Sequence, residues 1–140
     1  MSKLISKYQL YALGCLAFVA ACTPSEPPNT TVAMLDSPAA NGSMAPNLSK
    51  GHDGTTLLSW IEANGDGNAL KFSRFEENSW SSPIEVTRGD NWFVNWADFP
   101  SVVAVSESLW AAHWLVSQPA GGYAYDVNIA LSSDSGVTWS

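Results

Sequence analysis

Basic side chains are scarce in this chain of 140 residues, which holds 6 lysines and arginines against 13 aspartates and glutamates and has a formal net charge of −7. A nucleic-acid partner is therefore not expected, because too few cations are present to neutralise a run of phosphates. Cysteine and histidine are equally rare, with two residues of each. Since none of them has the spacing of zinc ligands, we expect no metal site and no cofactor.

Charged residues of both signs make up only 14% of the chain, whereas hydrophobic residues make up 46% and tryptophan occurs seven times. Disordered proteins show the opposite balance, so a folded domain is expected. The longest apolar stretch, Tyr8 to Ala21, is too short to cross a bilayer as an ordinary helix. The sequence thus predicts no membrane-spanning helix.

The N-terminus has the pattern of an export signal. Lys3 and Lys7 precede the apolar stretch, and residues Val19 to Cys22 follow at its end. The segment Val-Ala-Ala-Cys resembles the lipobox of bacterial lipoprotein signals. This resemblance implies cleavage before Cys22 and lipidation of Cys22, which would anchor the protein in a membrane. Thr23 stands where retained lipoproteins usually carry aspartate, so the outer membrane of a bacterium is the expected location.

Residues 1–21 are accordingly interpreted as the signal peptide and residues 22–45 as a lipidated, flexible tether. The tether is rich in proline, serine, threonine and asparagine and shows no sustained apolar period. Residues 46–140 carry the remaining apolar and aromatic pattern and are expected to fold.

An internal repeat organises this folded part. Residues 46–60 align without a gap on residues 100–114 at an offset of 54, and Pro46 and Trp60 coincide with Pro100 and Trp114. Further on, residues 70–80 align on 129–139 at an offset of 59. Because repeats of this length are typical of solenoids and propellers, we divide the folded part into units at about 46–99 and 100–140.

Short alternating apolar runs separated by turn residues predict β-strands in both units. The expected strands lie near residue 48 and at 55–62, 69–75, 80–87, 101–105, 109–117 and 125–132, with a further strand beginning at 137. Four antiparallel strands in each repeat are typical of propeller blades, which bury their faces against neighbouring blades. The predicted fold class is all-β, with about two four-stranded blades after the signal and tether.

The second unit ends in the motif S-x-D-x-G-x-T-W, formed by Ser132, Asp134, Gly136, Thr138 and Trp139. This motif resembles the Asp-box of sialidase-like (BNR-repeat) β-propellers, in which it is a structural turn between the third and fourth strands. The resemblance implies a propeller that generally has six blades. Two blades cannot close such a ring, so we expect the chain to be the N-terminal piece of a longer protein.

Sialidases of this family bind the substrate carboxylate with three arginines. At the first two matching places this chain has Met44 and Asn64, and only Asp66 stands near the expected acid. We therefore expect no sialic-acid hydrolysis. A hairpin turn is the alternative explanation for Asp66, and a surface role is expected for Arg74 rather than that of a ligand clamp.

The segment 88–99 is the most unusual of the chain, with two tryptophans, two aspartates and two asparagines between apolar residues. Aromatic rings can stack on a sugar while polar groups bind its hydroxyls. The ligand-binding candidates are Asp90, Asn91, Trp92 and Trp96, and Asp98 is a candidate catalytic acid. The alternative is that the aromatic rings of this segment fill the gap between blades.

The sequence thus predicts an exported surface lipoprotein whose sialidase-like propeller binds or processes glycans. One alternative is a non-catalytic scaffold that binds another protein, and a second is a true exo-sialidase, a glycoside hydrolase.

Overall fold

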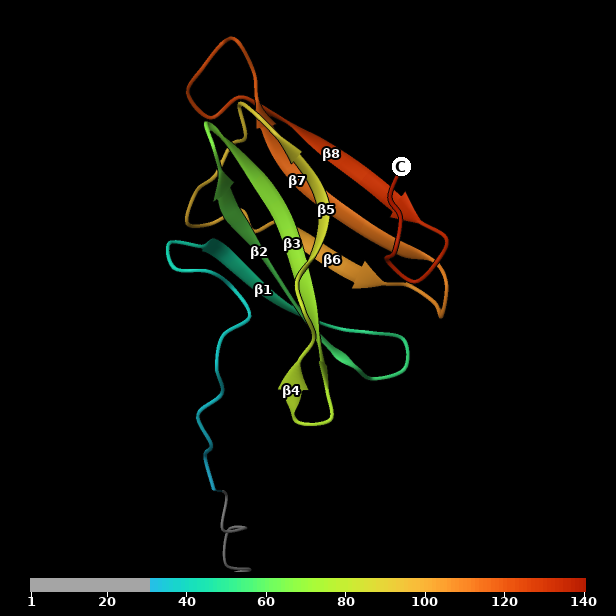
Figure 1. Ribbon diagram of the computed structural model, residues 1–140. Helices are drawn as coiled ribbons and strands as arrows, with labels where there is room; N and C mark the ends of the chain where they lie inside the picture. Colours follow the sequence, from blue (N-terminus) through green and yellow to red (C-terminus); the bar gives the residue numbers. More distant parts are fainter. Residues whose placement is uncertain (1–30) are drawn as a thin grey trace, which may run out of the picture. The chain divides into compact units, whose positions relative to one another are not determined.

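The computed structural model describes residues 31–140, and the predicted signal peptide and Cys22 lie outside this range. The chain divides into two units, Met1–Met34 and Leu35–Ser140, and all named strands belong to the second (Figure 1). Within residues 31–140 no helix is present, so the all-β prediction is confirmed. It follows that this part of the chain offers no helix able to span a membrane.

The strands form two antiparallel sheets. The first sheet contains β1 (Met44–Lys50), β2 (Thr56–Asn64), β3 (Gly67–Glu76), β4 (Ser79–Trp80) and β5 (Ile84–Gly89). The second sheet contains β6 (Ser101–Ala104), β7 (Trp110–Ser117) and β8 (Tyr125–Ser132). Each sheet belongs to one of the two repeat units.

The fourth strand of the first sheet is broken in two. β4 pairs with β3 at Phe75 and Glu76, whereas β5 pairs with the opposite end of β3, from Asn68 to Phe72. The single strand expected at 80–87 is therefore wrong in this detail. Pro83 lies in the break, where it has no N–H to donate to the ladder.

The first part of the repeat is confirmed at the level of strand register. Asn47 pairs with Ser59 and Lys50 with Thr56, and the residues 54 positions later pair in the same way, Ser101 with His113 and Ala104 with Trp110. The two sheets are thus built on the same framework.

The later part of the repeat does not keep the offset of 59. Ser73 pairs with Leu58, but Ser132 pairs with Trp110 rather than with Ala112. The displacement is two residues, so every side chain keeps its face of the sheet. No strand begins at Val137; instead Leu131 and Ser140 exchange two backbone hydrogen bonds across an eight-residue loop.

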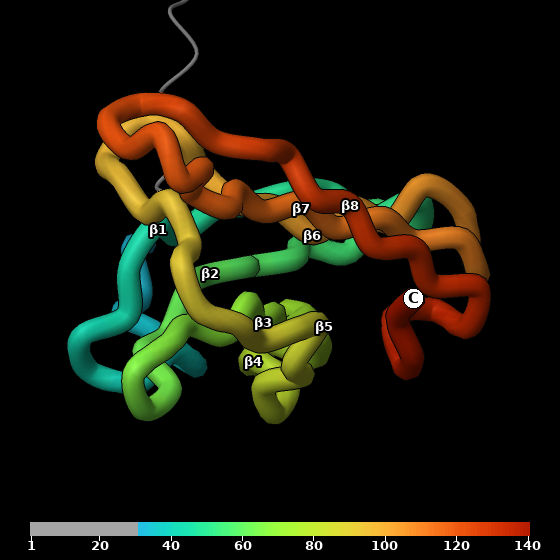
Figure 2. Tube along the Cα trace, turned by 90° about the horizontal axis from the view of Figure 1, so that it is seen from above, coloured from blue at the N-terminus to red at the C-terminus, as the bar shows by residue number. Residues whose placement is uncertain are grey.

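The hydrophobic core lies between the two sheets, which form separate layers in Figure 2. The first sheet contributes Leu57, Leu70, Phe72 and Val86, and the second contributes Val102, Ala104, Trp110, Ala112 and Ala130. All of them are buried. Because neither sheet could bury these side chains alone, the two repeat units stabilise each other.

Candidate functional site

Loops cluster at the two ends of the paired sheets. One end holds the β2–β3 turn, the segment 88–99 and the β7–β8 loop, and we call this end the aromatic end. The β7–β8 loop is the uppermost loop of Figure 1. The other end holds the β1–β2 and β6–β7 loops and the residues after β8, including the Asp-box; we call it the Asp-box end. The sequence-predicted residues are divided between these ends.

At the aromatic end, the start of segment 88–99 is attached to the second sheet. Ser117 donates its backbone N–H to the carbonyl of Asn91, Phe93 donates to the carbonyl of Leu115, and Trp92 forms a β-bridge with Val116. The chain thus extends the edge of β7 beyond the start of β6. Asn91 adopts a positive φ of 57° where the chain enters this bridge.

Trp92 and Trp96 have different environments. The ring of Trp92 stacks on Trp114 with 5.8 Å between ring centroids and packs against the core. Trp96 is 88% exposed. Trp92 therefore occupies the position that the gap-filling alternative describes, while Trp96 is free to meet a ligand.

A second exposed aromatic ring lies at this end. Tyr123, in the β7–β8 loop, is 87% exposed and contacts Phe93 edge-on at 5.9 Å. The other neighbour of Phe93 is Tyr125, stacked at 4.8 Å. These contacts attach the β7–β8 loop to segment 88–99. They leave most of the Tyr123 ring exposed to solvent.

Polar groups accompany the exposed rings. The side-chain oxygen of Asn95 accepts hydrogen bonds from the backbone N–H groups of Ala97 and Asp98. Its side-chain amide nitrogen donates a hydrogen bond to the Asp98 carboxylate at 2.8 Å. In the β7–β8 loop, Gln118 donates to Asp126 at 2.5 Å. Both carboxylates are exposed, so each retains free oxygen atoms that could accept bonds from hydroxyl groups.

The remaining predicted residues of this end lie around the β2–β3 turn. Asp66 is exposed in the two-residue turn closed by the pair Asn64–Gly67. Asp90 is exposed beside this turn, since a Cβ built on Gly67 would lie 2.6 Å from its Oδ1. Asp66 thus lies in a hairpin turn, as its alternative interpretation describes.

At the Asp-box end, Asp134 organises the loop after β8. Its Oδ1 accepts bonds from the Thr138 N–H at 2.8 Å and from the Ser132 hydroxyl at 2.7 Å, and its Oδ2 accepts from the Thr138 hydroxyl at 2.6 Å. These bonds, those from Thr138 foremost, lower the pKa of Asp134 to about 2. The carboxylate is therefore charged and accepts the hydrogen bonds that hold this loop together.

The same loop packs between the two sheets. Gly136 has a φ of +83°, and a Cβ built on it would lie 3.0 Å from both Phe72 and Trp110. Trp139 donates its ring N–H to the carbonyl of Gly136 and meets the Phe72 ring edge-on at 6.2 Å. The loop thus covers one end of the core.

Sequence reasoning missed the role of Arg74. Its guanidinium lies 4.4 Å from the Trp110 ring and donates to the carbonyl of Ser135, so this half-buried side chain joins the first sheet to the Asp-box loop. Arg74 is therefore not the simple surface side chain that was expected, because it links the two sheets. The partners stand 36 and 61 residues away, and nothing local in the sequence indicates them.

Arg74 also lines an open cleft of about 450 Å³ at the Asp-box end. The side chains of His52, Asp53, Glu107 and Trp110 contribute to its walls. The pKa of the Asp53 carboxyl is lowered, mainly because the backbone N–H of Thr55 donates to it at 2.9 Å. Within residues 31–140, no group of three or more metal-ligating side chains is present here or elsewhere.

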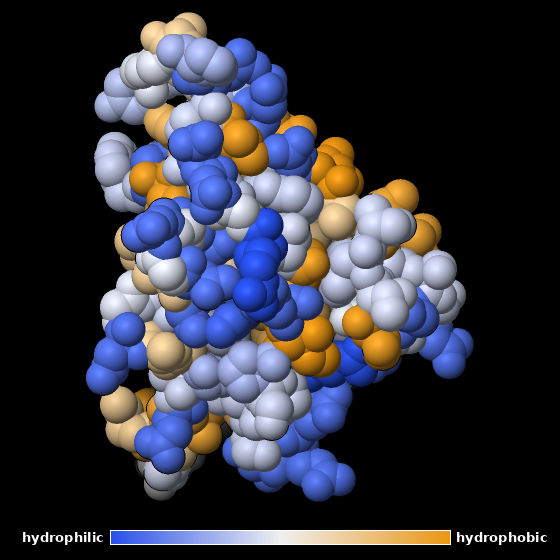
Figure 3. All heavy atoms as spheres, turned by 45° about the horizontal axis from the view of Figure 1, so that its top comes forward, coloured by the Kyte–Doolittle hydropathy of each residue, from blue (hydrophilic) through white to orange (hydrophobic). Residues whose placement is uncertain are grey.

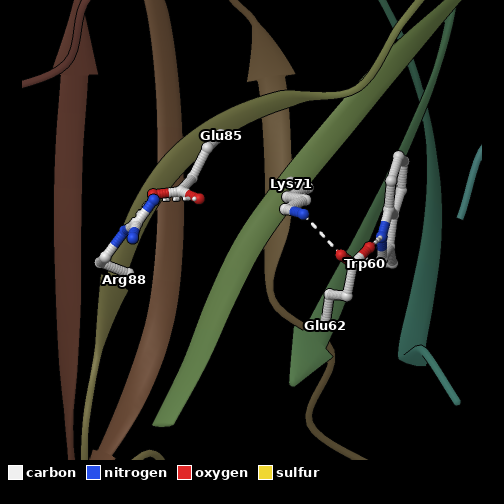
Figure 4. A network of polar contacts seen from close by, with 5 residues as sticks. All are labelled: Trp60, Glu62, Lys71, Glu85 and Arg88. Atoms are coloured by element: carbon white, nitrogen blue, oxygen red, sulfur yellow. Dashed lines mark hydrogen bonds and ion pairs between the residues drawn. The ribbon is translucent and has the colours of Figure 1, made fainter. Parts of the chain in front are cut away.

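A third polar cluster lies on the face of the first sheet that points away from the core (Figure 4). Glu62 accepts from Lys71 at 2.5 Å and from the Trp60 ring N–H at 3.1 Å. These two bonds, the one from Lys71 first, lower the pKa of Glu62. The same picture shows Arg88 paired with Glu85, at 2.6 Å.

Arg74 and Arg88 are too far apart to act together. Arg88 pairs with Ala69, five positions along β3 from Arg74, which is roughly 16 Å at the rise of a strand. Five is an odd number, so the two side chains also lie on opposite faces. They cannot bind one carboxylate jointly.

Comparison of the chain with protein-family models, with curated proteins and with solved structures found no match in any of the three.

Proposed function

We propose that this chain is the propeller part of an exported, lipid-anchored bacterial surface protein that binds glycans at its aromatic end. The observation that carries the glycan proposal is the exposure of Trp96 and Tyr123 on attached loops. Exposed aromatic rings can stack on the apolar face of a sugar, and the contact of Tyr123 with Phe93 lowers the entropy cost for that ring. The carboxylates of Asp90, Asp98 and Asp126 are exposed at the same end and supply hydrogen-bond acceptors.

The sialidase-like propeller is the architecture that best fits the two sheets. It is supported by the common register of β1–β2 and β6–β7 and by the hydrogen bonds of the Asp-box. Glycan binding is favoured over sialic-acid hydrolysis because Met44 and Asn64 stand at the places of the first two arginines, and Arg74 and Arg88 do not converge. In a glycosidase, Asp98 would be the first carboxylate to consider.

The glycan proposal is tested by the binding of the full chain to a glycan array, followed by titration of the strongest hit. We expect Trp96→Ala and Tyr123→Ala each to weaken binding about tenfold, because each removes one of the two aromatic rings that would stack on the sugar. Trp80→Ala is the matched control, because Trp80 lies at the opposite end of β3, against Phe75. Equal binding by all four proteins would refute the proposal.

The membrane anchor has a separate test. Cys22→Ser should move the chain from the detergent phase to the aqueous phase, or leave its signal uncleaved, while Cys15→Ser should change neither. Unchanged partitioning of the Cys22 variant would contradict lipidation.

A scaffold function is the second candidate, and a specific observation favours it. The outer face of the second sheet exposes Val103, Val127, Ile129 and Leu131. Contiguous apolar surface of this kind is typical of protein-binding sites.

A further inference from the structure

Two asparagines of the described chain are followed directly by glycine, in the pairs Asn41–Gly42 and Asn64–Gly65. Asparagine is among the thermolabile residues of proteins, because the backbone nitrogen of the next residue can attack its side-chain carbonyl carbon. A Cβ on that next residue hinders the approach, and glycine has none. Every other asparagine of residues 31–140 precedes a residue that carries a side chain. These two pairs are therefore the candidates for such a reaction.

Asn64–Gly65 lies at the tip of the β2–β3 hairpin. Asn64 ends β2 opposite Gly67, and Gly65 begins the two-residue turn with a φ of +62°, a conformation that glycine adopts without strain. Asn64 and Gly65 are both exposed. A Cβ built on Gly65 would meet no atom within 4 Å, so the space around this residue is open.

Asn41–Gly42 lies in the turn before β1. The N–H of Ser43 closes this turn by donating to the carbonyl of Ala40 at 3.2 Å, and Gly42 has a φ of +85°. Both residues of the pair are exposed, and a Cβ built on Gly42 would likewise meet no atom within 4 Å. The turn thus offers the same access as the hairpin tip.

The backbone N–H groups of these two glycines are free to react. The attacking nitrogen must first lose its proton, and a hydrogen bond donated by the N–H opposes that loss. Gly54 is an example of the bonded case, since its N–H donates to the carbonyl of Gly51 at 2.9 Å. Among the backbone hydrogen bonds of the turns and loops within residues 31–140, none is donated by Gly42 or Gly65. The nitrogen that the attack requires is therefore available at both sites.

We propose that this chain undergoes spontaneous deamidation at Asn41 and Asn64. The nitrogen of the following glycine forms a bond to the side-chain carbonyl carbon, and the bond from that carbon to the amide nitrogen breaks. Ammonia leaves, and a succinimide ring remains. Water then opens the ring, either at the side-chain carbonyl, which gives aspartate, or at the main-chain carbonyl, which gives isoaspartate. No oxidant or reductant takes part.

The product at Asn64 changes the aromatic end. A new carboxylate joins Asp66 in the same turn and Asp90 beside it, so negative charges gather there. Isoaspartate also adds one carbon to the main chain, at a turn whose two residues fit the pair Asn64–Gly67, and should loosen the hairpin tip. Figure 3, in which the top of Figure 1 comes forward, shows many hydrophilic residues on this side of the molecule. Deamidation makes this end more negative still.

The test is the intact mass of the purified full chain during incubation in mildly alkaline buffer, with peptide mapping to locate each change. We expect a gain of about one mass unit at each of the two sites. Asn64→Gln and Asn41→Gln should each remove one of these gains, because attack on glutamine requires a larger ring. Asn78→Gln is the matched control and should keep both gains, since Asn78 is exposed in the β3–β4 turn but precedes a serine.

Incubation in guanidinium chloride separates the effect of the fold from that of the sequence. Because both turns are open, Asn41 and Asn64 should react about as fast in the folded chain as in the unfolded one. A constant mass would overturn the proposal, and so would sites that react only in the unfolded chain. Equal reaction at Asn78 would also overturn it, since glycine would then make no difference. The glycan proposal does not depend on these results, because it rests on the rings of Trp96 and Tyr123.

Discussion

Asp134 shows how a single carboxylate can hold an exposed loop in place. Four of its hydrogen bonds come from residues within four positions, so the loop after β8 is organised locally around it. Because these bonds favour the charged form, the pKa of Asp134 is lowered from 3.8 to about 2 in the folded chain. A group with a lowered folded pKa stabilises the protein above its unfolded pKa and loses this contribution as the pH falls through the folded value.

We therefore expect Asp134→Asn to lower the melting temperature at pH 6. The difference from the wild type should shrink as the pH falls from about 4 to about 2 and vanish below, because the wild-type carboxyl is then protonated as well. The measurement is a melting curve at each pH, with Asp36→Asn as the control, since Asp36 is exposed. A constant difference between wild type and Asp134→Asn across this range would show that the charge of Asp134 is irrelevant.

At the scale of elements, the Asp-box loop is held against the core by a glycine. Gly136→Ala would place a Cβ 3.0 Å from Phe72 and Trp110 at a φ of +83°, so it combines backbone strain with a steric clash. We expect a loss of about 2–4 kcal/mol in the free energy of unfolding. Gly121→Ala is the matched control, because its φ is +71° but no atom lies within 4 Å. Denaturant titration of both variants separates the clash from the strain, and equal losses would exclude the clash.

The sequence was sufficient to predict most of the strands and local turns, because these depend on neighbouring residues, but not the break between β4 and β5 or the absence of a strand at Val137. Alternation of apolar residues indicated β2, β3, β7 and β8, and the motif around Asp134 indicated the loop that follows β8. The register of β8 could not be predicted in this way. A shift of two residues keeps the same pattern of faces, so the sequence pattern fits both registers equally.

The contacts of Trp92 and Arg74 could not be predicted for a different reason. Arg74 of the first sheet interacts with Trp110 across the gap between the sheets, and Trp92 stacks on Trp114 where the chain runs along the edge of β7. Trp92 and Trp96 look equivalent in the sequence, and the backbone bonds of Asn91 and Phe93 to β7 decide which ring packs against the core. Such choices depend on how the sheets pack rather than on local preference.

At the scale of the whole molecule, the core makes the two sheets interdependent. Phe72 is fully buried, tilts against Trp110 at 5.6 Å and meets Trp139 edge-on, so one side chain of the first sheet contacts both β7 and the Asp-box loop of the second. Removal of its ring should therefore destabilise both sheets together. We expect Phe72→Ala to lower the free energy of unfolding by about 3–5 kcal/mol, the usual cost of a phenylalanine cavity.

The wild type should unfold in one transition, with the same midpoint by far-ultraviolet circular dichroism, which follows the strands, and by tryptophan fluorescence, which follows the core. Trp80→Ala serves as the control for Phe72→Ala, because Trp80 packs on Phe75 in the β3–β4 hairpin and is absent from the shared core. If Phe72→Ala shifted only one of the two signals, the sheets would be separate folding units.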